Sequence, residues 1–338
     1  MVPPDYTEEF EVKHAFFDRP HLILLGAGAS SAAFPNGDKK GRKLPLLRDF
    51  VEIIGLHGQM SEAGISPPFD DFEAIYSQIA LNPELSLVQE RIDKLIYGYF
   101  ESLELPDEPT LYDLLVLSLR SKDVIATFNW DPFLWNACRR NRRFAETPNL
   151  LFLHGSVAIG RCDSCKVVLS KSSGFCTCGR EIAEIPILFP VTQKNYNSDP
   201  TIAAQWRRLQ RALKSCWAFT IFGYSAPKTD VEAVALLKDG WGNVSGRNLE
   251  EVEIIDVRDE DSLRASWDEF IHTHHYTVKS SFYDSWIGRH PRRSCEAIWA
   301  QNMECMYIQS FPAPQSISFD ELYDWLQPRL NEEFAVGF

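Results

Sequence analysis

Short apolar runs alternate with longer amphipathic segments along most of this chain, and this alternation limits the folds open to it. The runs are too short for stable helices, and most of them stop at glycine, proline or a polar turn residue, as buried strands do. They occupy residues 21–25, 123–127, 150–153, 185–189, 217–222 and 252–256. Strands that alternate with helices form right-handed βαβ units. The sequence therefore predicts an α/β fold with a mainly parallel sheet.

Polar residues with useful chemistry stand at the ends of these predicted strands. They are Ser30, Asn129, His154, Ser225 and Asp256. In open parallel sheets, ligands bind outside the carboxyl ends of the strands. The shared placement of these residues is more informative than any single motif.

The turn after the first predicted strand consists of small residues, Gly26-Ala27-Gly28-Ala29-Ser30. Such a turn lets the backbone approach a phosphate, and the helix that follows offers N–H groups and the positive end of its dipole. The third glycine of the dinucleotide fingerprint is absent, and no Lys-Ser or Lys-Thr pair follows as in a P-loop. Nucleotide binding and a plain tight strand-to-helix turn both remain open at this point.

Four of the eight cysteines lie in one short segment, spaced as Cys162-x2-Cys165-x10-Cys176-x-Cys178. Four thiolates at this spacing suit a closed, tetrahedral zinc site of the structural kind. The single residue within the second pair is less usual than two. In a reducing compartment, clustered cysteines indicate metal ligands and not disulfides.

Two single residues have both a structural and a chemical interpretation. Asn129 by itself is typical of a turn, and a lone His154 is more often structural than catalytic. At the carboxyl end of a strand, however, a histidine with a pKa near neutrality can act as a general base. Asp131, directly before Pro132, suits the N-cap of a helix that begins there.

Composition narrows the classes of function. The chain has 34 basic and 47 acidic residues, a net charge of −13, which argues against direct nucleic-acid binding. Its first residues lack the pattern of a secretory signal, and no apolar run approaches the length of a membrane helix. We therefore expect a cytoplasmic protein that does not enter a membrane.

Taken in order, GAGAS, TFNWD, LHGS, the cysteine segment, FGYS and the strand that ends at Asp256 resemble the sirtuin-like family. The resemblance covers about residues 18–260. It implies a Rossmann-like NAD-binding catalytic domain over residues 1–260, with a helical insertion at about 41–118 and a zinc-knuckle module at about 160–182. Residues 261–338 would form a C-terminal extension for packing or assembly.

The resemblance also implies roles for individual residues. Asn129 would bind the nicotinamide ribose or position a water, and His154 would be the general base. NAD would be the substrate and zinc a structural ion. The NAD-binding residues would be Gly26, Ala27, Gly28, Ala29 and Ser30 at the phosphates, Asp131 at the carboxamide, Gly223 and Ser225 at phosphate or ribose, and Asp256 near the adenine ribose. The zinc ligands would be Cys162, Cys165, Cys176 and Cys178.

Departures from the family pattern point to one branch of it. The segment AAFPNGDKKGRKLP replaces the G-I-P-x-F-R stretch of deacylating sirtuins, so its arginine is displaced. Pro190 lacks the N–H that strand-like peptide binding uses, and bulky Trp130 stands where the family has a small aliphatic residue. These features resemble the bacterial branch that hydrolyses NAD during antiviral defence.

The sequence thus predicts an NAD+ glycohydrolase that releases nicotinamide and ADP-ribose, an NAD-depleting effector of bacterial antiphage defence. An NAD-dependent protein deacylase and a non-catalytic sensor of NAD or ADP-ribose are the alternatives. The resemblance suggests that the chain assembles with further copies of itself or with a DNA-handling ATPase.

Overall fold

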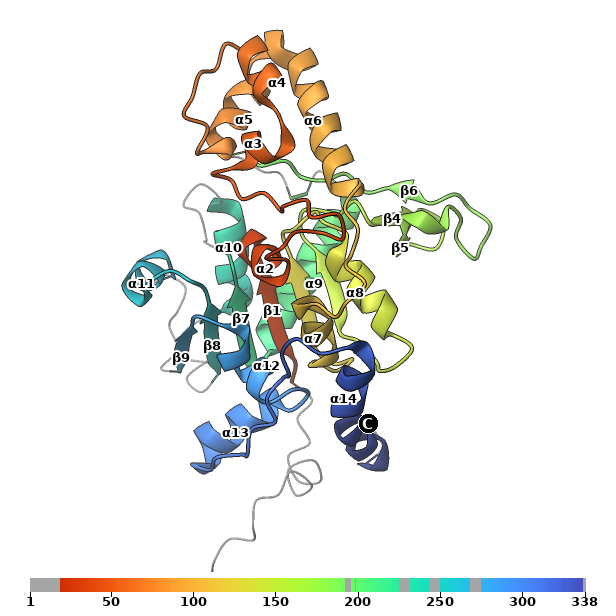
Figure 1. The fold of residues 1–338 in the computed structure, drawn as a ribbon, viewed down its shortest axis with the longest axis vertical. Helices are drawn as coiled ribbons and strands as arrows, with labels where there is room; N and C mark the ends of the chain where they lie inside the picture. The colour runs from red at the N-terminus through yellow and green to blue at the C-terminus, as the bar shows by residue number, and fades with distance from the viewer. Residues whose placement is uncertain are drawn as a thin grey trace, which may run out of the picture.

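The main sheet is parallel throughout and has six strands in the described part of the chain (Figure 1). The computed structural model describes residues 19–191, 196–197, 199–224, 231–242, 250–267 and 275–336. The strand order is β3-β2-β1-β7-β8-β9, which is 3-2-1-4-5-6 when the strands of this sheet are counted along the chain. The strands are β1 (His21–Leu25), β2 (Val124–Thr127), β3 (Asn149–Phe152), β7 (Ala218–Phe222), β8 (Glu251–Ile255) and β9 (Tyr276–Lys279).

This order defines the Rossmann fold. The predicted Rossmann-like parallel sheet is therefore confirmed. Register is continuous across the centre of the sheet, where Leu25 of β1 lies opposite Thr127 of β2 and Phe222 of β7. The carboxyl ends of these three strands consequently lie at the same level.

Both faces of the sheet are covered, which explains why the central strands are almost wholly apolar. Leu22 and Leu24 of β1 pack in one core with residues of α9, α10 and α11, whereas Ile23 and Leu25 pack in a second core on the other face. The helices of the first face are α9 (Pro200–Ser215), α10 (Val231–Trp241) and α11 (Glu260–Trp267). Those that contribute to the second core include α2 (Ala27–Ala33), α7 (Leu111–Leu117) and α8 (Phe133–Asn141).

A layer of helices stands beyond the carboxyl ends of the strands, at the top of Figure 1. Its longest helix, α6, buries Val88, Ile92, Ile96 and Phe100, which recur every four residues and so line one face. The elements of this layer are α3 (Phe50–Ile54), α4 (His57–Glu62), α5 (Phe72–Ala80), the 3₁₀ turn η1 (Pro83–Leu85) and α6 (Ser86–Glu101).

The cysteine segment forms a small antiparallel sheet between β3 and α9 in the chain. Its order is β5-β4-β6, with β4 (Ile159–Cys162), β5 (Val167–Ser170), the 3₁₀ turn η2 (Lys171–Ser173) and β6 (Ala183–Glu184). The predicted strand at 185–189 is wrong, since those residues belong to no sheet. Pro186 and Pro190 have no N–H to donate, and Leu188 donates its own to the carbonyl of His154 (2.9 Å).

The residues beyond 260 take part in the main sheet, because β9 pairs with β8 along one edge. After β9 come η4 (Phe282–Asp284), α12 (Trp286–Arg289), α13 (Ser294–Glu304) and α14 (Phe319–Val336). Helices α13 and α14 lie at the opposite end of the molecule from the α3–α6 layer (Figure 1). The division into a catalytic domain and an extension stays a prediction. None of the described helices combines the length and the apolarity that a membrane span requires.

Candidate active site and cysteine centre

The strand order reverses between β1 and β7, and this reversal is where Rossmann folds bind dinucleotides. Here the loops after the two strands are in direct contact. The Gly28 N–H donates to the Gly223 carbonyl (2.9 Å), and a Cβ added to Gly223 would lie 2.2 Å from the Ala29 nitrogen. Close packing of the two loops therefore explains why glycine stands at this position. Phosphate contacts of Gly26, Ala27, Gly28, Ala29, Ser30 and Gly223 stay a prediction.

Four polar side chains meet beside this contact, and we call them the edge cluster: Ser30, Tyr112, Asn129 and Asp131. The Asn129 side-chain amide donates to the Gly26 carbonyl (2.9 Å) and to Ser30 Oγ (2.8 Å). Ser30 Oγ donates to Asp131 Oδ2 (2.7 Å). Because that hydroxyl hydrogen is committed to Asp131, Tyr112 OH donates to Ser30 Oγ (2.8 Å). The cluster thus ties the end of β2 to the loop after β1.

Asp131 is the buried acid of the edge cluster. Burial raises the pKa of its carboxyl to about 6, against the opposing effect of the hydrogen bonds from Ser30 and from the Phe133 N–H. The predicted N-cap position of Asp131 is wrong by one residue, since α8 begins at Phe133 with Pro132 at its N-cap, and Asp131 instead accepts from the Phe133 N–H (3.1 Å). A carboxyl that titrates close to neutrality is typical of functional sites. Its contact with a carboxamide stays a prediction.

His154 follows β3 and is held by aromatic rings. Its Nε2 lies 3.0 Å from the Tyr196 hydroxyl, and its ring lies 4.7 Å from that of Phe128 and nearly parallel to that of Tyr196. Only 8% of the residue is exposed. The next residue, Gly155, has φ +77°, and a Cβ there would lie 2.5 Å from the Pro186 carbonyl. The imidazole is therefore fixed in place beside the end of the sheet.

The predicted site residues follow five neighbouring strands of the sheet. From β3 to β8 across the sheet they are His154, Asn129, the Gly26–Ser30 loop, Gly223 and Asp256. Direct hydrogen bonds join Ser30, Asn129 and Asp131, whereas Asp256 is paired with Arg258 (2.9 Å). Ser225 lies outside the described residues.

Sequence reasoning missed Tyr112 and Tyr196. Tyr112 lies in an apolar helical stretch and has the local pattern of a core residue. Tyr196 comes 42 residues after His154, with the cysteine module between them. No local signal in the sequence connects either tyrosine to its partner, because both contacts depend on how distant segments pack.

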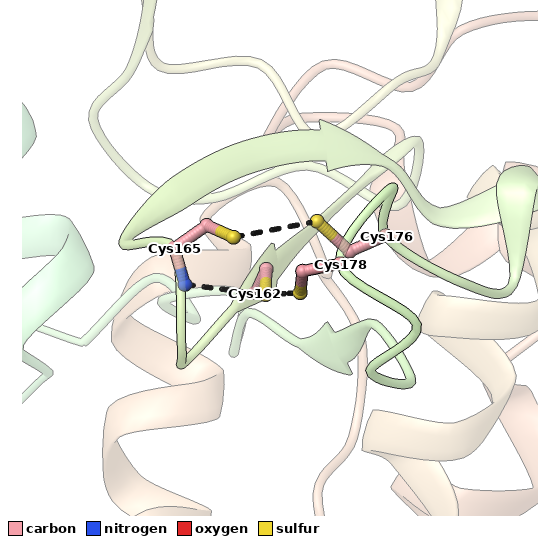
Figure 2. A group of neighbouring side chains, drawn as sticks. All are labelled: Cys162, Cys165, Cys176 and Cys178. Atoms are coloured by element: carbon pink, nitrogen blue, oxygen red, sulfur yellow. Dashed lines mark hydrogen bonds between the residues drawn. The ribbon is translucent and has the colours of Figure 1, made fainter.

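The four clustered cysteines point toward a common centre (Figure 2). Their sulfurs all lie within 4.8 Å of one another, with 3.5 Å between Cys162 and Cys178 and 3.8 Å between Cys165 and Cys176. Four sulfurs placed tetrahedrally at about 2.3 Å from a zinc ion are ~3.8 Å apart. The geometry is thus compatible with a structural zinc ion held by four thiolates. The module that they form lies in the chain between His154 and its partner Tyr196.

Of the comparisons with known proteins, only the comparison with solved structures gives matches. No protein-family model and no curated protein matches the chain. It is similar to a structure described as "Structural Basis for the Mechanism and Regulation of Sir2 Enzymes", with 12% identity over 96% of this chain and 98% of that chain and a TM-score of 0.40. It is also similar to a Sir2 homolog in complex with NAD, with 15% identity over 84% and 90% of the chains and a TM-score of 0.37. The fold assignment rests on the strand order of this chain and not on these likenesses.

Proposed function

We propose that the chain is an NAD+ glycohydrolase. The observation that supports this most is the position of the edge cluster, beside the strand-order reversal of a Rossmann sheet, with His154 at the end of β3, the strand next to β2. That reversal suits a dinucleotide. The residues beside it supply an amide, an acid and an imidazole, and these are the groups that hydrolysis of a charged glycoside needs.

The nicotinamide of NAD is a cationic leaving group, so the bond from ribose C1′ to the ring nitrogen breaks with its electron pair going to that nitrogen. The sugar becomes oxocarbenium-like, and a water oxygen bonds to C1′ while its proton passes to the His154 imidazole. A positioned general base contributes about 10²–10⁴-fold. Asn129 would orient the ribose or the water, and Tyr196 would position the imidazole through its bond to Nε2.

One observation favours water over an acylated lysine as the acceptor. Trp130 is 9% exposed, and its ring lies 5.4 Å from that of Phe100 and 5.7 Å from that of Phe189. Phe189 also stacks on Tyr76 of α5 (5.4 Å). Aromatic side chains therefore occupy the region between the helical layer and the end of β2, and Phe189 and Pro190 stand where the family resemblance expects the acyl peptide. Deacylation is accordingly the second candidate.

The biological setting proposed here rests on the sequence resemblance. In it, the chain depletes cytoplasmic NAD during bacterial antiphage defence and is restrained until it assembles with further copies or with a DNA-handling ATPase. An enzyme that consumes the NAD of its own host requires such restraint.

The deciding experiment measures nicotinamide release from NAD by the full chain, with and without an acetyl-lysine peptide. We expect peptide-independent release that falls by at least about 100-fold in Asn129→Ala and in His154→Ala. Asn149→Ala and His57→Ala are the matched controls, since both residues are exposed and lie away from the site. Release that requires the peptide would instead establish a deacylase. If NAD is bound but never cleaved, even with candidate partners added, the sensor alternative is correct.

A further inference from the structure

A cavity of about 120 Å³ lies in the C-terminal part of the chain, at the opposite end of the sheet from the edge cluster. Helices α12 and α13 form two of its walls, and the segment after α13 forms the third. That segment turns at Cys305 (φ +55°), where the Met306 N–H donates to the Ala300 carbonyl of α13 (3.0 Å), and it reaches the end of α12, where the Phe311 N–H donates to the Arg289 carbonyl (2.8 Å). The cavity is lined by Trp286, Arg289, His290, Ala297, Gln301, Met306, Tyr307 and Ile308.

His290 is the buried polar residue of this cavity. It is 5% exposed, and its Nδ1 has no hydrogen-bond partner among the described residues. A buried nitrogen without a partner costs about 1–3 kcal/mol, so a group that satisfies it binds with a gain in free energy. Burial and the charge of Arg289 lower the pKa of the His290 ring to about 4. The ring is therefore neutral at pH 7, and Nδ1 can carry a hydrogen to donate.

Arg289 supplies a positive charge at the same cavity. Its side chain is exposed and forms no ion pair within the described ranges. A guanidinium group in this situation favours a planar carboxylate, which it can bind through two parallel hydrogen bonds. The charge and the unpartnered nitrogen together select an anion that accepts hydrogen bonds from both residues.

The remaining lining residues determine which uncharged part of a ligand the cavity can hold. Trp286 is held in place, because its backbone N–H donates to Glu253 (2.9 Å) and its indole N–H to Glu251 (3.3 Å). Its fixed ring, with Ala297, Met306 and Ile308, offers an apolar and partly aromatic wall. The volume exceeds the space of a few waters but is below the 300–1,000 Å³ typical of drug-sized ligands. The ligand is consequently small.

We propose that this cavity binds a small aromatic carboxylate, with the carboxylate between Arg289 and His290 Nδ1 and the ring against Trp286. The site lies outside the NAD-binding crevice and does not depend on the proposed function. A binding experiment without NAD therefore tests it separately.

Sodium benzoate is the probe, titrated into the full chain in the absence of NAD and followed by calorimetry. We expect saturable binding, about tenfold weaker with benzamide, which lacks the charge, and weaker with acetate, which lacks the ring. Arg289→Gln and His290→Phe should each weaken benzoate at least about tenfold, whereas Arg91→Gln, the same charge change on an exposed arginine of α6, should not alter it. His290→Phe should not lower the melting temperature, since it removes a buried nitrogen that has no partner.

Three outcomes would overturn the proposal. The first is no binding of benzoate at millimolar concentrations. The second is equal affinity for benzoate and benzamide. The third is wild-type affinity in a folded Arg289→Gln variant, with folding checked by its melting temperature.

Discussion

The main sheet carries two groups of hydrogen-bonded, buried polar side chains, and they differ in where they lie on the strands. The edge cluster lies at the carboxyl ends of the strands. The second group, which we call the inner cluster, consists of His21, Thr220, Glu253 and Ser294. Thr220 donates to Glu253 (3.1 Å), so His21 Nε2 donates to Thr220 (2.7 Å) and Nδ1 accepts from Ser294 (2.7 Å).

The two clusters are alike in chemistry. Each joins hydroxyls to a carboxyl whose pKa burial raises, to about 6 for Asp131 and to about 7 for Glu253. In the inner cluster, however, His21, Thr220 and Glu253 lie within strands and Ser294 is the first residue of α13, and all four are almost completely buried. Asn129 of the edge cluster is only half-buried. The two clusters therefore differ in position and not in chemistry, and only the edge cluster lies at the carboxyl ends of parallel strands, where ligands bind in open α/β sheets.

Disruption of the four-cysteine centre should separate the clusters most strongly. A structural zinc site contributes on the order of 10 kcal/mol to the folding of its own module. Because this module joins His154 to Tyr196, Cys178→Ser should lose the metal and most of the nicotinamide release, while the inner cluster stays intact. Elemental analysis and hydrogen exchange of β4–β6 against β7–β8 would measure this. Cys305→Ser, at an exposed cysteine outside the module, is the control, and a Cys178→Ser protein that keeps one zinc would contradict the prediction.

Gly223→Ala should have the second largest effect, because it disturbs the contact between the loops after β1 and β7. The new Cβ would lie 2.2 Å from the Ala29 nitrogen, at a residue with φ +62°. Backbone strain and overpacking together should cost about 4 kcal/mol in urea unfolding. Gly242→Ala shares the positive φ (+86°) but meets no atom within 4 Å, so it should cost only about 1 kcal/mol. Equal losses in the two variants would show that the loops are not in close contact.

The two carboxyls should make folding stability depend on pH. Each binds its proton more tightly when folded than when unfolded, so stability falls as pH rises from about 4 to 7, by about 3 kcal/mol per group. Asp131→Asn should abolish the loss of folding stability that is complete by about pH 6. Glu253→Gln should abolish the loss of stability that continues to about pH 7. Only Asp131→Asn should reduce nicotinamide release. Loss of activity in Glu253→Gln would break the distinction between the clusters.

Single hydrogen bonds should have the smallest effects. Ser294→Ala leaves a buried histidine nitrogen without its donor and should cost about 1–2 kcal/mol, with unchanged nicotinamide release. Tyr112→Phe removes from the edge cluster the bond to Ser30 and the longer bond that the hydroxyl accepts from the Asn129 amide (3.4 Å), at a similar cost, and should also slow release. Melting temperatures and initial rates of both variants would test this, and equal rates would argue that Tyr112 has no part in the site.

Local patterns predicted most of the sheet and the positions of the site residues along it. Five of the six apolar runs are strands of the main sheet, because a short apolar run that ends in a turn is typical of a buried strand. The prediction of a strand at 185–189 was wrong, since Pro186 within this run and Pro190 directly after it have no N–H for ladder hydrogen bonds. Asn129 and His154 follow β2 and β3 as the sequence predicts, because polar residues after parallel strands gather at one edge, and their catalytic roles stay a prediction.

The partners of those residues could not be predicted. Tyr112 reaches Ser30 across 82 residues, and Tyr196 reaches His154 across 42. The strand β9 also lies beyond the segment that the sequence resemblance covers, yet it completes the sheet. Each of these contacts depends on packing between distant elements, which periodicity and motif spacing do not encode.

The sequence by itself determined the α/β class, the zinc-compatible cysteine spacing and the residues that end the central strands, because these follow from periodicity and residue chemistry within a few positions. Only the tertiary structure decided which loops touch at the strand-order reversal and which polar groups are paired. It also decided that the buried histidine of the C-terminal cavity lacks a partner. Those properties depend on contacts between segments that are far apart in the chain, and only the packing of the folded protein determines such contacts.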